Sequence, residues 1–220
     1  MTGLKRWPTT AWRTLLDLAL EALDELGPEV EWAFGGGTAL SLVLDHRVSY
    51  DVDIFLEDAG NLRKLSPNRN EASRAITDVW QEPGHYLKLE RDEGEIDFIV
   101  ASRLTACDTW SYSHRGRDIP VEDPAEILAK KLQYRGSRFI PRDIFDLLAI
   151  HRHDPGIVEM AVQAVPEGAE RAVDRIRRIH GRYLTTISDE VNPTSRGLEL
   201  LDIDPSEAAD ILEGFLKVDA

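Results

Sequence analysis

The chain has 220 residues, with 40 acidic and 26 basic side chains and a formal net charge of −14. This acidic balance argues against a protein that is steered to nucleic acid by its overall charge. Hydrophobic residues make up 42% of the chain, enough for a proper core, and the single cysteine, Cys107, excludes an internal disulfide and a cysteine-based zinc site. No apolar run has membrane-spanning length and no secretory pattern opens the chain, so we expect a cytoplasmic protein.

The first predicted elements lead into a glycine-rich turn. Residues 12–26 carry apolar side chains at helical spacing and predict an amphipathic helix behind a sheet. Residues 30–34 alternate as a short strand, and glycines 35–37 separate this strand from a second helix that opens near Thr38. Unpaired backbone N–H groups at a helix start attract anions, and glycine lets a phosphate approach closely. The pattern indicates either a phosphate-binding turn or an ordinary strand-to-helix connection.

Two aspartates lie on the next predicted strand, Tyr50 to Leu56. The alternation of the strand places Asp51 and Asp53 on one face, together with Phe55. Like charges this close repel one another unless a cation lies between them, and Mg²⁺ prefers hard oxygen ligands of this kind. The pair therefore predicts a metal site, with a solvated polar strand face as the alternative.

A third carboxylate, Asp97, follows in a predicted hairpin. Residues 61–70 indicate a polar loop and residues 71–81 a helix, and residues 86–91 and 95–100 then form the two hairpin strands. Asp97 lies mid-strand among apolar neighbours, where a buried carboxylate needs a cation or several donors. If its strand pairs beside that of the first two aspartates, the three form a site for two metal ions. The alternative is a charge on an edge strand.

Residues 117–121 could form one last strand, and a helix follows in which Asp123 is the expected N-cap. Lys131 falls on the apolar stripe of this helix, so it must either extend its ammonium to solvent or meet an anion. Lys130 points elsewhere and is expected at the surface. The next helix opens with Asp143 and Asp146, for which favourable interaction with the helix dipole is the simplest explanation.

The remaining sequence predicts helices over residues 155–165, 168–186 and 205–217. Within the second of these, arginines recur at spacings of three and four and share a face; they are Arg171, Arg175, Arg178 and Arg182. This face could bind a nucleic acid. The alternative is a solvated face that forms ion pairs with the many acids of the chain.

Four ordered segments, GGGTALSL, HRVSYDVDIF, EIDFIV and KKLQYRGSRFIPRDIFDL, together resemble the AbiEii/AbiGii nucleotidyltransferase toxin family, over roughly residues 30–150. That family belongs to the polymerase beta superfamily and includes MenT-like toxins, some of which add nucleotides to the 3′ end of tRNA. The resemblance implies an α+β minimal nucleotidyltransferase fold, a mixed β-sheet backed by helices with an α-helical C-terminal part. We expect a catalytic domain over residues 1–120 and a helical domain over residues 121–220 that completes the nucleotide site.

The resemblance also implies roles for individual residues. The phosphate-binding Gly-Gly-Thr of the family matches Gly36, Gly37 and Thr38, its Arg-x-Ser matches Arg47 and Ser49, and its metal-binding pair matches Asp51 and Asp53. Lys131 would hold the triphosphate. The family's Arg-Asp-x-x-Asp-Leu falls on residues 142–147, which favours Asp143 as a working residue that orients the lysine or acts as a base. The match at Asp97 is weaker, so the third acid stays open between Asp97 and Asp143.

The expected activity is transfer of a nucleoside monophosphate from a nucleoside triphosphate to an acceptor hydroxyl, with Mg²⁺ or Mn²⁺ as cofactor. The resemblance favours a tRNA 3′ end as acceptor, a role as the toxin of a toxin–antitoxin or phage-defence system, and a cognate antitoxin as partner. The acidic composition makes a protein hydroxyl, modified by AMPylation-type transfer, the alternative acceptor. A non-catalytic module that binds nucleotide or a partner is a further alternative, because fold alone does not fix function.

Overall fold

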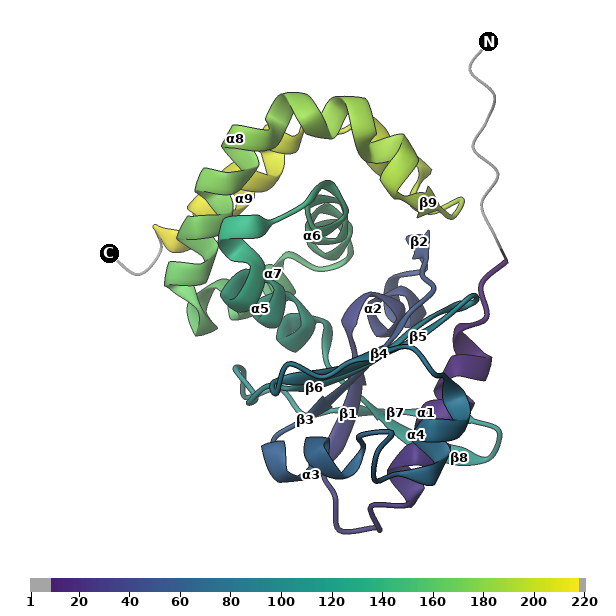
Figure 1. Ribbon diagram of the computed structural model, residues 1–220. Helices are drawn as coiled ribbons and strands as arrows, with labels where there is room; N and C mark the ends of the chain where they lie inside the picture. Colours follow the sequence, from purple (N-terminus) through teal and green to yellow (C-terminus); the bar gives the residue numbers. More distant parts are fainter. Residues whose placement is uncertain (1–8, 218–220) are drawn as a thin grey trace.

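The computed structural model describes residues 9–217, which fold into a mixed β-sheet and a set of helices stacked on one of its faces (Figure 1). Within this range the large sheet has seven strands in the order β4-β5-β6-β3-β1-β8-β7. The strands of this sheet are β1 (Trp32–Gly35), β3 (Val52–Leu56), β4 (Trp80–Gln81), β5 (Tyr86–Arg91), β6 (Gly94–Val100), β7 (Trp110–His114) and β8 (Arg117–Val121).

The strand pairings determine where the acidic side chains lie. β3 runs parallel to β6 and antiparallel to β1, and β1 runs parallel to β8. Val52, Ile54 and Leu56 of β3 point into the hydrophobic core, which is covered by helices α1 (Trp12–Asp24), α3 (Ala59–Lys64) and α4 (Glu71–Ile76). Figure 1 shows these three helices on one side of the sheet. The alternate residues of β3 therefore face the other side.

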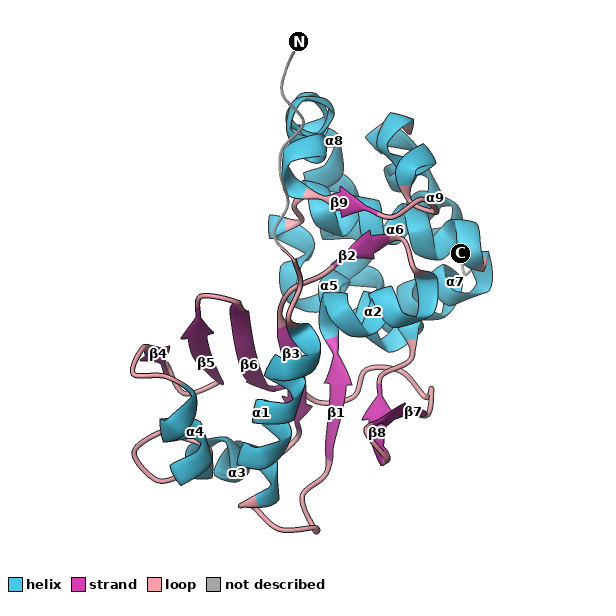
Figure 2. Ribbon diagram, turned by 90° about the vertical axis from the view of Figure 1, so that its right-hand side faces the viewer, coloured by secondary structure: helices cyan, strands magenta, loops and turns pink. Residues whose placement is uncertain are grey.

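Helices occupy this other side of the sheet. They comprise α2 (Gly36–Leu44), α5 (Pro124–Arg135), α6 (Pro141–His153), α7 (Pro155–Ala164), α8 (Pro166–Glu190) and α9 (Pro205–Leu216), with 3₁₀ turns η1 (Gly136–Arg138) and η2 (Leu198–Asp202). Figure 2 shows the later helices gathered at one end of the molecule and the sheet at the other. A two-stranded ribbon, β2 (Arg47–Val48) with β9 (Asn192–Pro193), ties the segment after α2 to the C-terminal helices.

The α+β fold predicted from the sequence, a mixed β-sheet backed by helices, is confirmed, and so are the hairpin of β5 and β6 and the last strand, β8. The helix predicted over residues 71–81 is wrong beyond Ile76. Thr77 is extended, and Trp80 and Gln81 then pair with β5. The loop predicted over residues 61–70 is also wrong in part, because α3 begins at Ala59, where the Asp58 side chain accepts a hydrogen bond from the backbone N–H of Gly60.

Besides β4, which falls within the predicted helix, the strands β2, β7 and β9 have no counterpart in the sequence prediction. β2 and β9 have two residues each and exist only because segments distant in sequence meet. β7 alternates exposed and partly buried side chains, the pattern of an edge strand, and its aromatic residues were the available signal. Among residues 9–217, no helix combines the length and the apolar character needed to cross a bilayer.

Candidate active site

The glycine turn brings the start of α2 against the acidic strand. α2 begins at Gly36, so Thr38 lies in its first turn, as the sequence predicts. Its hydroxyl donates a hydrogen bond to the backbone oxygen of Asp51, 2.5 Å away, which ties the turn to the segment that carries the aspartates. Gly36 has a φ of 67°, and an added Cβ there would overlap the carboxylate of Asp53. Only glycine allows this close approach.

We expect Gly36→Ala to lower the free energy of unfolding by about 2 kcal/mol or more, because the positive φ and the overlap with Asp53 both oppose a side chain. Gly181→Ala is the matched control, since Gly181 lies in α8 with nothing within 4 Å of an added Cβ. This control should be stabilised by about 0.5–1 kcal/mol. Urea unfolding of both variants measures the difference, and equal stability would contradict the role assigned to Gly36.

The three predicted acids come together at the end of two neighbouring strands. Asp53 of β3 lies directly opposite Asp97 of β6 in the parallel register, so the strand pairing on which the predicted metal site depends is present. Asp51 immediately precedes β3, and its Oδ1 accepts a hydrogen bond of 3.1 Å from the backbone N–H of Glu95. Lys88 of β5 lies 3.4 Å from an oxygen of Asp97. We refer to Asp51, Asp53 and Asp97 as the acidic triad.

Neighbouring cations do not fully compensate the negative charge of the acidic triad. Burial and the charge of Asp51 raise the pKa of Asp53 to about 6. Burial and the charge of Asp53 likewise raise the pKa of Asp97 to about 7, although Lys88 opposes the shift. One buried oxygen of Asp97, Oδ1, has no hydrogen-bond partner. A cation bound here would relieve both the repulsion and the unpaired oxygen.

The donor set suits a metal ion that is completed by a substrate. Among residues 9–217, no three Asp, Glu, His or Cys side chains form a preassembled metal cluster. Mg²⁺ does not require one, because it is commonly bound by one or two carboxylates together with substrate phosphates and water. The unpaired oxygen of Asp97 and its neighbour Asp53 fit this mode of binding.

Lys131 of α5 contacts anions, which is one of the two outcomes that the sequence predicts for its side chain. Its ammonium lies 2.8 Å from Asp143 and 2.8 Å from Asp146, both of which are fully buried. Asp143 also accepts from the backbone N–H of Ile140 and therefore caps α6. Asp143 thus contacts the lysine from within the helical part, whereas Asp97 lies beside Asp53. Of the two candidates for the third acid, Asp97 is the one that adjoins the other aspartates.

Asp146 joins the two halves of the molecule. Its carboxylate accepts hydrogen bonds from His46 (2.8 Å), from two nitrogens of Arg47 (2.6 and 3.0 Å) and from Lys131 (2.8 Å). Burial alone would raise the pKa of Asp146, but Arg47, Lys131 and His46 hold it well below its usual value. Burial lowers the pKa of His46. From the sequence, Asp146 was attributed only to a favourable interaction with the helix dipole, because its contacts with His46 and Arg47 join residues about 100 positions apart.

A cleft of about 620 Å³ lies between the acidic triad and α5 with its following turn. The predicted site residues that line it are Gly36, Gly37, Arg47, Ser49, Asp51, Asp53, Asp97 and Lys131. Thr38 and Asp143 are buried and do not line it. Further lining residues were not predicted from the sequence; they are Lys88, Tyr134, Arg135, Arg138 and Arg142. Arg135 follows Lys131 at helical spacing, a pattern that could have identified it, whereas Arg138 and Arg142 lie beyond the end of α5.

The surface location predicted for Lys130 is wrong. Its side chain is buried, its ammonium pairs with Glu122 and lies 3.5 Å from Glu126, and it rests 3.9 Å from the centre of the Phe55 ring. Lys130 was misplaced because the apolar stripe of α5 indicates only one buried face. Both faces of this helix are covered, one by the helical part and one by the sheet and the loop at residues 104–105.

A glycine turn that packs against paired strand aspartates, with a basic helical wall across the cleft, is the arrangement of a nucleotidyltransferase. The family model "Nucleotidyl transferase AbiEii toxin, Type IV TA system" matches residues 18–213. The chain belongs to this AbiEii family and is a nucleotidyltransferase toxin of the type IV toxin–antitoxin class.

Solved structures of similar fold share little sequence with the chain. A candidate nucleotidyltransferase from H. pylori superposes with a TM-score of 0.50 at 15% identity and covers 96% of this chain and 95% of its own. MenT4, a nucleotidyltransferase toxin from Mycobacterium tuberculosis H37Rv, gives a TM-score of 0.48 at 15% identity over 94% and 91% of the two chains. JHP933 from Helicobacter pylori gives 0.46 at 15% identity over 96% and 93%. No curated protein matches the sequence.

Proposed function

We propose that the enzyme transfers a nucleoside monophosphate from a nucleoside triphosphate to an acceptor hydroxyl in a Mg²⁺-dependent reaction. The observation that carries this proposal is the opposition of the acidic triad to the cations of α5 and α6 across one cleft. Acids on one side suit metal ions and cations on the other suit a triphosphate. When bound, Mg²⁺ would neutralise phosphate charge and lower the pKa of the attacking hydroxyl.

The other roles in the reaction would belong to residues of the chain itself. Asp51, Asp53 and Asp97 would hold the metal ions, and the carboxylate of Asp97, which lies opposite Asp53, would also accept the proton of the acceptor hydroxyl. The backbone N–H groups of Gly36 and Gly37 at the start of α2 suit a phosphate. These glycines, together with Ser49 and Arg47, would contact the triphosphate on the side of the sheet.

On the opposite wall, Lys131 would stabilise the charge that develops on the leaving pyrophosphate. Asp143 and Asp146 hold its ammonium in place from behind, which fixes the direction in which the lysine presents its charge. Arg142 is near enough to Asp53 to lower the pKa of that aspartate and therefore lies within the field of the acidic triad. We assign Arg142 to the triphosphate as well.

We expect Arg142→Gln to raise the KM for the nucleoside triphosphate about tenfold, because a guanidinium contact to phosphate contributes on the order of 1–3 kcal/mol. The free energy of unfolding should change by less than about 0.5 kcal/mol, since Arg142 is partly exposed. Arg152→Gln, which removes an exposed arginine paired with Glu199, is the control and should leave KM unchanged. An unaltered KM in Arg142→Gln would show that this arginine does not bind the nucleotide. Steady-state kinetics with varied nucleotide makes the comparison.

For the acceptor we propose the 3′ end of a tRNA, with an antitoxin as the partner that counteracts the toxin. A single-stranded 3′ end presents few phosphates, so the cations of the cleft can hold it although the whole chain is acidic. The arginine face of α8 gives this proposal little support. Arg171 and Arg182 lie 3.8 Å from Glu167 and Glu190, and Arg175 donates to the backbone oxygen of Phe139.

The acceptor is identified by incubating the protein with Mg²⁺, total bacterial RNA and cell protein while each α-labelled nucleoside triphosphate is supplied in turn. Label in a tRNA-sized band supports the proposal. Label on protein would replace it with nucleotidylation of a protein hydroxyl, which the net charge of −14 favours as the second candidate. The absence of label with every nucleotide and both acceptor pools would contradict transfer and leave a module that only binds.

A further inference from the structure

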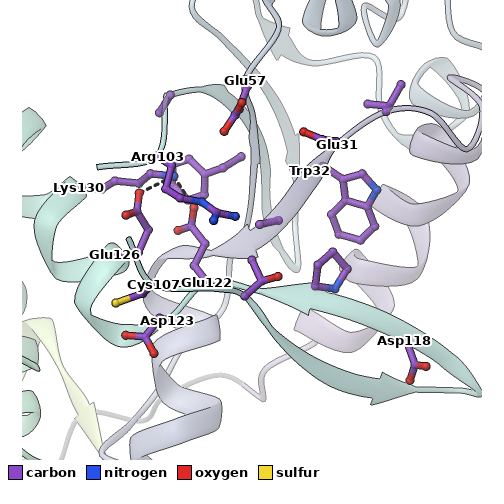
Figure 3. A pocket seen from close by; sticks show the side chains of 16 residues that line it. Glu31, Trp32, Glu57, Arg103, Cys107, Asp118, Glu122, Asp123, Glu126 and Lys130 are labelled. Atoms are coloured by element: carbon purple, nitrogen blue, oxygen red, sulfur yellow. Dashed lines mark hydrogen bonds and ion pairs between the residues drawn. The ribbon is translucent and has the colours of Figure 1, made fainter. Parts of the chain in front are cut away.

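A second pocket, of about 470 Å³, lies on the same face of the sheet as the cleft (Figure 3). Phe55, Ala101 and Lys130 line both cavities, so the second pocket begins where the cleft ends. Its floor is formed by alternate residues of three strands, such as Phe55 on β3 and Pro120 on β8. The first turns of α5 and the segment that precedes β7 form its walls.

The charge of this pocket is opposite to that expected of a phosphate site. Its lining carries six carboxylates and two cations; the carboxylates are Glu31, Glu57, Asp118, Glu122, Asp123 and Glu126, and the cations are Arg103 and Lys130. Arg103 is partly engaged, 3.8 Å from Asp108. An anionic ligand such as a nucleotide or an RNA backbone would be repelled here, whereas a cationic ligand would be attracted.

The deepest acid, Glu122, has an unused oxygen. The residue is only 4% exposed, and its Oε2 is buried without a hydrogen-bond partner, while Oε1 pairs with Lys130. Figure 3 shows this pair within the pocket. Gly35, which has no side chain, leaves the space that the carboxylate occupies. Burial raises the pKa of Glu122 to about 7 although Lys130 opposes the shift, which indicates that the local cation does not fully compensate the carboxylate.

The carboxylate of Glu126, the neighbouring acid, already has hydrogen-bond partners. Its two oxygens accept hydrogen bonds from the backbone N–H groups of Leu104 and Thr105 and from the Thr105 hydroxyl, at 2.8–3.1 Å. The buried side of the pocket therefore contains two carboxylates, Glu122 and Glu126, beside one ammonium, that of Lys130. One negative charge remains for a ligand, and Glu122 offers the free acceptor.

Three other acids of the pocket lie nearer to solvent than Glu122 and Glu126. Glu31, Glu57 and Asp118 are exposed and stand apart from one another around the entrance in Figure 3. A single small cation that reaches Glu122 would leave these outer carboxylates without partners. An extended polypeptide can place one basic side chain at the deep acid and others along the rim, which matches the two levels of charge.

We propose that the second pocket binds the guanidinium or ammonium group of a basic polypeptide segment, with Glu122 as the deep acceptor and the outer carboxylates as secondary contacts. A guanidinium suits this carboxylate because it stays charged and would donate a charge-assisted hydrogen bond to Oε2, while Oε1 keeps its contact with Lys130. The proposal does not depend on the identity of the nucleotide acceptor. The basic side chain of this polypeptide partner would lie directly beside the nucleotide cleft.

Isothermal titration calorimetry tests the proposal without nucleotide. The probe is the capped pentapeptide acetyl-Gly-Gly-Arg-Gly-Gly-amide, and the control peptide carries citrulline, which has nearly the same shape and no charge, in place of arginine. The intact protein should bind the arginine peptide about tenfold more tightly than the citrulline peptide, since one charged hydrogen-bonded contact is worth roughly that factor. Equal affinities would overturn the proposal. A peptide with further arginines, acetyl-Arg-Gly-Arg-Gly-Arg-amide, should bind more tightly than the pentapeptide because it also reaches the outer carboxylates, and equal binding would overturn the polypeptide assignment.

Variants locate the binding. Glu122→Gln keeps the shape of the side chain and should weaken the arginine peptide about tenfold, whereas Glu207→Gln, an exposed acid of α9, should have no effect and controls for nonspecific attraction to the acidic chain. An unchanged affinity in Glu122→Gln would overturn the assignment. If that variant does not fold, as judged by circular dichroism, Glu57→Lys at the rim decides: a weaker complex supports the pocket, and an unaltered one excludes it.

Discussion

Asp53→Asn is expected to reduce nucleotide transfer by about a thousandfold or more while it makes the protein more stable at pH 8. Activity falls because an amide is a poor ligand for the metal ion and cannot replace the carboxylate charge. Stability rises because the substitution removes a carboxylate whose pKa is raised to about 6 by burial and by Asp51. A shift of this size corresponds to roughly 2–3 kcal/mol in the free energy of unfolding.

The pH dependence distinguishes this explanation from a general packing effect. The native state holds the proton of Asp53 up to pH about 6, whereas the unfolded chain loses it near its ordinary value, so the stability of the intact protein decreases as the pH rises through this window. The advantage of the variant should therefore be full above pH 7 and absent near pH 4. Urea unfolding at both pH values measures it. A constant difference would show that charge is not the cause.

Ligands should reverse the order of stability. Mg²⁺ with a non-hydrolysable nucleotide analogue stabilises whichever native state binds it. We expect the midpoint of thermal unfolding to rise in the intact protein and to remain unchanged in Asp53→Asn. An equal rise in both proteins would mean that the metal and nucleotide bind without Asp53, contrary to the assigned role of the acidic triad.

Asp146→Asn is expected to have the largest effect on folding, a loss of about 3–5 kcal/mol in the free energy of unfolding. Asp146 is fully buried and compensates Arg47 and Lys131, which are themselves almost fully buried. Removal of one partner from such a pair leaves uncompensated charge in the interior. Asp143 still contacts Lys131 in this variant, so the uncompensated charge is mainly that of Arg47.

The matched control is Asp210→Asn, which changes an exposed aspartate of α9 and should alter stability by less than about 0.5 kcal/mol. Urea denaturation compares the two variants with the intact protein. Because Asp146 also bridges the β2 segment and α6, its loss should abolish transfer at temperatures where the fold persists. A stable Asp146→Asn variant of normal activity would exclude the hub as a determinant of the site.

The elements that the sequence predicts correctly are those whose signals are local. The turn chemistry and alternation around Asp97 establish the hairpin of β5 and β6, and Asp123 with Pro124 defines the start of α5. The acidic triad could be predicted in the same way, because alternation assigns Asp53 to a face, and a buried mid-strand Asp97 requires a compensating cation. Only the pairing of the two strands had to come from the structure.

The features that could not be predicted depend on contacts between distant segments. In the sequence Asp146 looks like an ordinary acid near the start of a helix, but in the structure His46 and Arg47 contact it from the other side of the cleft. Lys130 lies off the apolar stripe of α5, and its burial requires Glu122 and the Phe55 ring, which come from two different strand segments. Periodicity describes one helix at a time and does not reveal that a second face will be covered.

We propose that the acidic triad and Lys131 together carry out the transfer of a nucleoside monophosphate with release of pyrophosphate. The most direct measurement supplies the protein with Mg²⁺, the acceptor RNA and the same nucleoside triphosphate labelled either on its α-phosphorus or on its γ-phosphorus. We predict that the α-label enters the acceptor, that the γ-label is released as pyrophosphate, and that both signals disappear in Asp53→Asn. Entry of the γ-label into the acceptor, or undiminished α-label transfer by Asp53→Asn, would contradict this mechanism.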